Sequence, residues 1–165
     1  FIRTAIYKEV GGLDAGFFAH QEEIDMCWRL RSRGYRLVCT PQSVVYHVGG
    51  ATLSVESPRK TFLNFRNNLL MLYKNLPEKD LRHVMRVRFW LDYIAATKFL
   101  LCGHFPNAKA VYEARKAFFE MKPEYATKRR ENLNKTTLTD IPELMRQSLI
   151  VAFYLKGRKK FTDLK

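Results

Sequence analysis

The pattern of hydrophobic and polar positions changes about one third of the way along the chain. Before residue 53, short β-prone runs alternate with glycine-containing turns. From Ser57 onward, apolar residues recur at helical spacing, first as Phe62, Phe65, Leu69, Leu72 and Leu76. The pattern predicts a small α/β region followed by a larger, mainly α-helical one.

The first region is predicted to hold one helix and two short strands. The helix should begin at residue 20 or 21 and end near Arg33, because acidic residues occupy its first turn and Gly34 stands just after it. Strands are expected at residues 35–39 and 43–48. Two strands are too few for a sheet, so we expect further strands upstream of Phe1 and treat the chain as a fragment.

Prolines and glycines divide the second region into four predicted helices, at residues 58–76, 77–102, 106–122 and 142–155. Ser57 and Pro58 supply an N-cap and a first-turn proline. Pro123 should stop the third helix and leave residues 124–139 as a loop or frayed helix. Gly157 and the basic residues 158–160 follow the last helix.

Charge separates the same two regions. The chain of 165 residues carries a net charge of +13. Residues 1–52 hold 6 basic and 5 acidic residues, a net charge of +1. Residues 53–165 hold 23 basic and 11 acidic residues, a net charge of +12. We therefore divide the chain into residues 1–52 and 53–165, and expect the second part to meet an anionic partner, either nucleic acid or a membrane surface.

The cysteines and the apolar runs bear on location. Cys27, Cys39 and Cys102 show no metal-binding spacing and fit free thiols in a reducing compartment. No secretory signal is seen, so a cytoplasmic location is expected. Residues 89–102 are apolar but contain Asp92 and Lys98, and a span needs about 20 apolar residues. This helix is expected either at the inner membrane face or buried in a bundle.

Three carboxylates, Glu22, Glu23 and Asp25, crowd the start of the first predicted helix. A carboxylate acts as a general base when it lies within hydrogen-bond reach of the proton it takes. The alternative is structural: Glu22 and Glu23 satisfy the helix N-terminus, and Asp25 pairs with Arg29 four residues later. The residues alone leave both open.

A series of motifs extends this cluster: Gly11-Gly12-Leu13-Asp14, Phe17-Phe18, Glu22-Glu23-Ile24-Asp25, Trp28-Arg29-Leu30, Gly34-Tyr35, Pro41 and Val45-Tyr46-His47. Their order resembles the C-terminal part of family 2 glycosyltransferases of the GT-A type, over about the first third of the chain. The remainder resembles the helical extension of bacterial members that modify lipid-linked sugars. The resemblance implies an α/β fragment of a nucleotide-diphospho-sugar transferase fold, acting in polysaccharide biosynthesis of the cell envelope.

The resemblance also implies a reaction. A sugar would pass, with inversion, from a nucleotide-diphospho-sugar to a hydroxyl of a glycan or lipid-linked acceptor. Glu23 matches the family's base, but this chain has Glu-Glu where Glu-Asp is usual, so Glu22 is a second candidate. A divalent metal, Mn²⁺ or Mg²⁺, would be held mainly by a nucleotide-binding half. The Asp-x-Asp motif of that half does not occur in this sequence, so we expect residues 1–165 alone to be inactive.

Four further residues are candidates for binding. Arg29 is a candidate for the leaving diphosphate or for pairing with Asp25. Asp25 is expected to shape the substrate site through Arg29, and Trp28 either fills the core or offers a platform to a sugar. His47 is either structural or approaches the metal or diphosphate, as the resemblance implies.

Two readings compete with catalysis. One is a basic helical module that binds an anionic membrane or nucleic acid. The other is a helical scaffold with a decayed enzyme remnant. The basic residues are dispersed among apolar helices and no nucleic-acid recognition motif is present, so no nucleic acid partner is expected.

Overall fold

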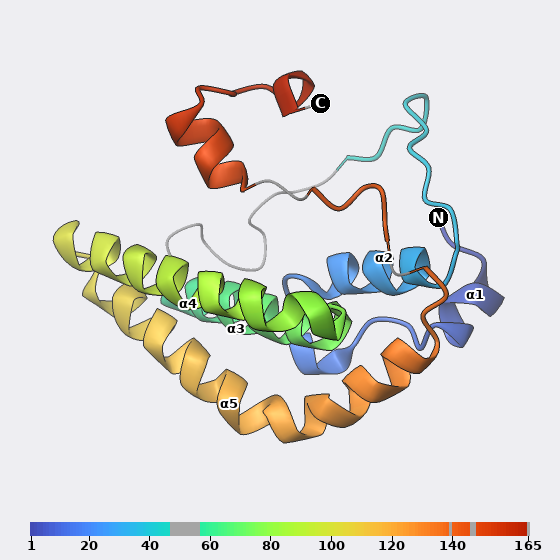
Figure 1. Cartoon of the computed structure of the whole chain (residues 1–165), viewed down its shortest axis with the longest axis horizontal. Helices are drawn as coiled ribbons and strands as arrows, with labels where there is room; N and C mark the ends of the chain where they lie inside the picture. The colour runs from blue at the N-terminus through green and yellow to red at the C-terminus, as the bar shows by residue number, and fades with distance from the viewer. Residues whose placement is uncertain (47–56, 139, 146–147, 165) are drawn as a thin grey trace.

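The computed structural model describes residues 1–46, 57–138, 140–145 and 148–164. Five α-helices lie in these ranges: α1 (Thr4–Glu9), α2 (Glu22–Ser32), α3 (Pro58–Asn75), α4 (Glu78–Leu101) and α5 (Phe105–Asn134). The shorter helical segments in these ranges are η1 (Ala15–Phe17), η2 (Val151–Leu155) and η3 (Phe161–Leu164). Figure 1 shows α3, α4 and α5 running alongside one another, with α2 beside one end of them.

The α/β expectation is wrong. None of the residues in the described ranges forms a strand, and residues 35–46 run as extended chain and turns. Val38 and Tyr46 are 77% and 96% exposed. β-propensity expresses packing against a neighbouring strand, and these segments have no such neighbour in the described structure. The all-helical fold therefore also overturns the resemblance to family 2 glycosyltransferases, whose fold is built on a sheet.

The predicted helix boundaries hold in α2, α3 and α4. Gly34 follows α2 with φ +85°, and the Tyr35 amide bonds back to the Leu30 carbonyl at 3.0 Å, which closes the helix end. Pro58 opens α3 as its first residue, and Gly103 follows α4 with φ +77°. These ends are dictated by local chemistry, which explains why the sequence predicts them.

Two helices differ from expectation. α5 continues through Pro123 to Asn134, so residues 124–134 are helical and not a loop. A proline removes one backbone donor and bends a helix, and Figure 1 shows α5 as a bent helix. The predicted helix at 142–155 is reduced to a helical stretch at residues 149–155 among the described residues. α1 was not predicted.

One hydrophobic cluster joins residues from both halves of the sequence. It consists of Phe17, Leu69, Leu70, Met71, Phe118 and Tyr125, with Trp28 packed against it. Gly16 lies close to this cluster, where an added Cβ would stand 2.5 Å from the Tyr125 hydroxyl. The division into residues 1–52 and 53–165 stays a prediction, but side chains from both parts share this core.

A buried ion-pair group ties α4 to α5. The Asp92 carboxylate is fully buried and meets Arg88 at 2.5 Å and Arg115 at 2.8 Å. Burial raises the pKa of Asp92, and the two guanidinium groups oppose that shift. Trp90 and Ile94 on the same helix are each 63% exposed. α4 therefore packs against α5 on one face and exposes apolar side chains on another.

Candidate functional site

The residues directly before α2 adopt backbone conformations that are rare outside glycine. Phe18 has φ 63° and ψ −60°, and His20 and Gln21 have φ 69° and 72°. The Ala19 amide bonds to the Phe17 carbonyl at 2.7 Å, which makes Phe18 the centre of a strained γ-turn. We call residues 17–21 the pre-helix turn. Such strain persists only where neighbouring contacts fix it, and it concentrates at functional sites.

α3 supplies the contacts that hold the pre-helix turn. The fully buried Asn67 places its Nδ2 at 2.9 Å from the Phe17 carbonyl, 2.7 Å from that of Ala19 and 2.8 Å from that of His20. Arg66 adds a hydrogen bond of 3.2 Å to the Phe17 carbonyl. The turn is thus held by two neighbouring side chains from a helix far away in sequence.

The turn leads straight into the two glutamates. Glu22 and Glu23 are the first residues of α2, and Glu23 is exposed whereas Glu22 is half-buried. Within the described ranges, Glu22 Oε2 and His20 Nε2 are buried atoms with no hydrogen-bond partner. Burial, together with the charge of Glu23, raises the pKa of the Cys27 thiol. The start of α2 therefore has one exposed carboxylate, on Glu23, and two buried polar atoms without partners, on His20 and Glu22.

Asp25 is placed differently from the glutamates. It is fully buried, and its carboxylate meets Arg29 Nε at 2.8 Å, Lys74 Nζ at 3.0 Å and Asn75 Nδ2 at 2.8 Å. The predicted i,i+4 pair with Arg29 is confirmed. Asp25 thus joins α2 to α3 and stands in the core of the molecule.

Arg29 is also buried and hydrogen-bonded to other parts of the protein. Besides Asp25, its guanidinium donates to the carbonyls of Val10 and Gly12, the latter at 2.6 Å. The side chain is 5% exposed. A guanidinium with three protein partners is held in place, so Arg29 and Asp25 connect α2 to the segments packed against it. Their contact with a diphosphate or another substrate stays a prediction.

A second carboxylate, Asp14, lies in the same network. It pairs with Lys74 at 2.8 Å and with Lys128 from α5 at 3.0 Å. Burial acts to raise the pKa of Asp14, but the hydrogen bonds and charges of the two lysines outweigh it and lower the pKa from 3.8 to about 2. Lys74 therefore bridges Asp14 and Asp25.

This pKa predicts how stability depends on pH. The folded pKa of Asp14 lies below its unfolded value of 3.8, so its contribution is present above pH 3.8 and is lost as the pH falls toward about 2. The shift is worth about 2 kcal/mol. Urea unfolding followed by circular dichroism should show this loss, and Asp14→Asn should remove that part of the slope. An identical slope in the variant would contradict the assignment.

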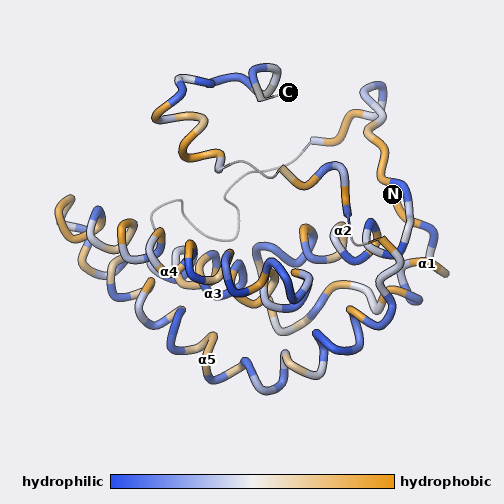
Figure 2. Tube along the Cα trace, viewed as in Figure 1, coloured by the Kyte–Doolittle hydropathy of each residue, from blue (hydrophilic) through white to orange (hydrophobic). Residues whose placement is uncertain are grey.

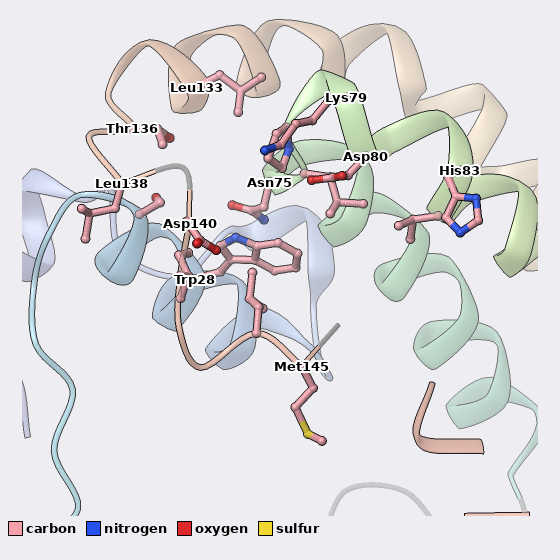
Figure 3. A pocket seen from close by; sticks show the side chains of 16 residues that line it. Trp28, Asn75, Lys79, Asp80, His83, Leu133, Thr136, Leu138, Asp140 and Met145 are labelled. Atoms are coloured by element: carbon pink, nitrogen blue, oxygen red, sulfur yellow. The ribbon is translucent and has the colours of Figure 1, made fainter. Parts of the chain in front are cut away.

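Trp28 contributes to a pocket on another face of α2. The pocket has a volume of about 560 Å³ and lies between α2, the start of α4 and the end of α5 (Figure 3). Polar side chains also line the pocket, among them Lys79, Asp80, His83 and Asp140. Trp28 both packs on the core and lines this pocket, so the two sequence readings of Trp28 are compatible. Glu22 and Glu23 do not line it.

In the described part of the chain, no group of side chains is arranged to bind the predicted metal ion. No three His, Cys, Asp or Glu side chains gather there at metal-binding distance. His47 lies outside the described residues. A bound Mn²⁺ or Mg²⁺ stays a prediction, and no chemical step below depends on it.

Sequence reasoning missed His20, Asn67, Lys74 and Lys128. The burial of Asn67 and Lys74 could have been predicted, because both lie on the same face of α3 as Leu63 and Leu70. Polar residues on an apolar stripe are buried with partners. The partners themselves, in the pre-helix turn and at Asp14 and Asp25, come from distant sequence and leave no local trace.

The γ-turn makes a direct prediction. Phe18→Gly should leave the free energy of unfolding unchanged or raise it by up to about 1 kcal/mol, because glycine relieves the backbone strain and the Phe18 side chain is 66% exposed. Chemical denaturation measures the change. The matched control is Tyr46→Gly, an exposed aromatic without positive φ, which should gain nothing. A loss above about 1 kcal/mol for Phe18→Gly would show that the turn is not strained.

The described site thus combines a strained turn, two glutamates, a buried ion-pair network and a pocket beside Trp28. No protein-family model, curated protein or solved structure matches this chain.

Proposed function

We propose that this chain supplies the catalytic base for transfer of a sugar from a nucleotide-diphospho-sugar to a hydroxyl of a glycan or lipid-linked acceptor. The observation that carries the proposal is the pre-helix turn, strained at Phe18 and held by Asn67, which leads directly to Glu22 and Glu23. Strained backbone held by a distant helix is typical of sites that position reacting groups. The turn and the carboxylates support a positioned general base, whereas the choice of sugar transfer as the reaction comes from the motif order of residues 11–47.

The exposed Glu23 is assigned as the base. Its carboxylate would accept the proton of the acceptor hydroxyl while that oxygen forms a bond to the anomeric carbon. The bond from the anomeric carbon to the phosphate oxygen breaks, and the nucleoside diphosphate leaves with the electron pair. Attack from the opposite face inverts the configuration. The exposure of the Glu23 side chain supports this assignment, because the acceptor hydroxyl must come within hydrogen-bond reach of the base.

Other residues of the site would position the base and the acceptor. Asp25, Arg29 and Lys74 anchor α2 against α3 and so hold the base in place. The pocket beside Trp28, with its carboxylates and lysine, suits further sugar units of the acceptor. No described helix has an apolar stretch of the length and composition needed to cross a bilayer. We place the reaction in the cytoplasm at the inner membrane face.

Substitution of Glu23 tests the proposal. In the protein made from its native reading frame, Glu23→Gln should lower transfer of labelled sugar from nucleotide-diphospho-sugars by roughly 10²–10⁴-fold. Transfer at the wild-type rate would remove Glu23 as the base.

A second candidate function is binding of an anionic membrane without catalysis. It is favoured by the C-terminal part of the chain, where an exposed apolar stretch adjoins a cluster of cationic residues.

A further inference from the structure

Residues 148–160, which we call the C-terminal segment, form a short helical stretch followed by a basic cluster. Residues 149–155 are helical, and the Val151 amide donates to Ser148 Oγ at 3.3 Å at the start. At the end, Gly157 adopts φ +65° and the Arg158 amide bonds to the Ala152 carbonyl at 3.0 Å. A serine before the helix and a left-handed glycine after it are local signals, so this stretch is built by its own sequence.

The helical stretch is apolar and unusually exposed. Tyr154 and Leu155 are 74% and 80% exposed, and Ala152 alone of the residues 149–155 is buried. The other exposed side chains are Leu149, Ile150, Val151 and Phe153. Figure 2 shows this continuous hydrophobic stretch lying apart from α3, α4 and α5. Contiguous exposed apolar surface of this kind marks a site of contact with a partner or a membrane.

The charge next to this stretch is one-sided. Lys156, Arg158, Lys159 and Lys160 place four cationic side chains in five residues. No acidic residue occurs between Glu143 and Asp163. The cluster begins directly where the helix ends, so the apolar and cationic surfaces adjoin.

We propose that the C-terminal segment binds the surface of an anionic lipid bilayer. Its apolar side chains would enter the boundary between headgroups and acyl chains, and its lysines and arginine would contact the lipid phosphates. Tyr154 suits this depth because its ring is apolar and its hydroxyl is polar. Seven helical residues span about 10 Å, too short for a bilayer of roughly 30 Å, so the segment lies on the membrane.

Charge complementarity selects the bilayer over a second copy of the chain. Two copies meeting through this surface would bring two clusters of four cations together, and like charges repel. An anionic headgroup layer neutralises the cluster and covers the apolar stretch at the same time. In binding of this kind, the buried apolar area and the attraction to anionic lipids both add to the affinity. This inference does not rest on the transfer reaction.

Co-sedimentation with vesicles tests the inference. The purified chain should sediment with phosphatidylglycerol–phosphatidylcholine vesicles at about 0.15 M salt and not with phosphatidylcholine alone. Neutralising the cluster in K156Q/R158Q/K159Q/K160Q should weaken binding by roughly 10- to 100-fold. The matched control, K109Q/K116Q/K122Q/R130Q, removes four exposed cations from α5 and should change binding less than about threefold.

A second pair of variants tests the apolar contribution. Tyr154→Ser with Leu155→Ser should weaken vesicle binding roughly tenfold or more, whereas Trp90→Ser with Ile94→Ser, at comparably exposed positions of α4, should not. All four side chains are exposed, so circular dichroism should show the helical fold unchanged. Equal losses in the two pairs would overturn the assignment to the C-terminal segment. Binding to duplex or single-stranded nucleic acid without vesicle binding, or dimerisation that Leu155→Ser abolishes, would overturn the choice of a bilayer.

Discussion

Replacing Asp25 by alanine is expected to lower the free energy of unfolding by about 3–5 kcal/mol. The substitution removes a fully buried carboxylate, which leaves the buried Arg29 without a carboxylate partner and Lys74 with Asp14 alone. Small domains are stable by only about 5–15 kcal/mol, so most of the folded population can be lost. Asn75, whose side chain donates to Asp25 at 2.8 Å, would also lose an acceptor.

Denaturant unfolding of the chain, followed by its helical circular dichroism, measures this effect. The control is Glu23→Ala, an acidic residue two positions earlier on the same helix, which is exposed and should change stability by less than about 0.5 kcal/mol. Asp25→Asn keeps the shape and part of the hydrogen bonding and should fall between the two. A change below about 1 kcal/mol for Asp25→Ala would show that Asp25 does not anchor α2.

The helix ends that could be predicted from the sequence are those set by local chemistry. Pro58 at the first position of α3, and Gly34 and Gly103 just after α2 and α4, act on their immediate neighbours. The C-terminal helical stretch ends at Gly157 for the same reason. In each case the residue type alone decides the conformation.

The errors have a common physical cause, which is dependence on distant packing. Residues 35–39 and 43–46 have strand-like composition but are not strands, because no neighbouring strand lies in the described structure. α5 passes through Pro123 because its flanking residues Phe118 and Tyr125 are buried against α3 and the pre-helix turn. Tertiary contacts there outweigh the local cost of proline.

In the candidate site, too, some features follow from local chemistry and others from distant packing. Spacing alone predicts the Asp25–Arg29 pair and the crowding of Glu22 and Glu23. The strained turn at Phe18 could not be predicted, because its stability depends on Asn67, fifty residues from Phe17 along the chain. Local rules identify the acidic residues, whereas the fold decides which of them are exposed.

Replacing Glu23 by glutamine should have the largest effect on activity. Glutamine keeps the size of the side chain but cannot take a proton, so the loss should appear in kcat and amount to roughly 10²–10⁴-fold. Glu22→Gln should have a smaller effect, because Glu22 is half-buried and would only assist. Glu131→Gln, an exposed change on α5, is the matched control and should leave transfer unchanged.

The most direct measurement is therefore the rate of transfer of labelled sugar from nucleotide-diphospho-sugars to glycan or lipid-linked acceptors by these three variants. The protein should be made from its native reading frame, with stability measured in parallel. We predict that Glu23→Gln loses transfer while its free energy of unfolding stays within about 0.5 kcal/mol of the wild-type value. Wild-type transfer by Glu23→Gln, or equal losses in Glu23→Gln and Glu131→Gln, would contradict the assignment of Glu23 as the base.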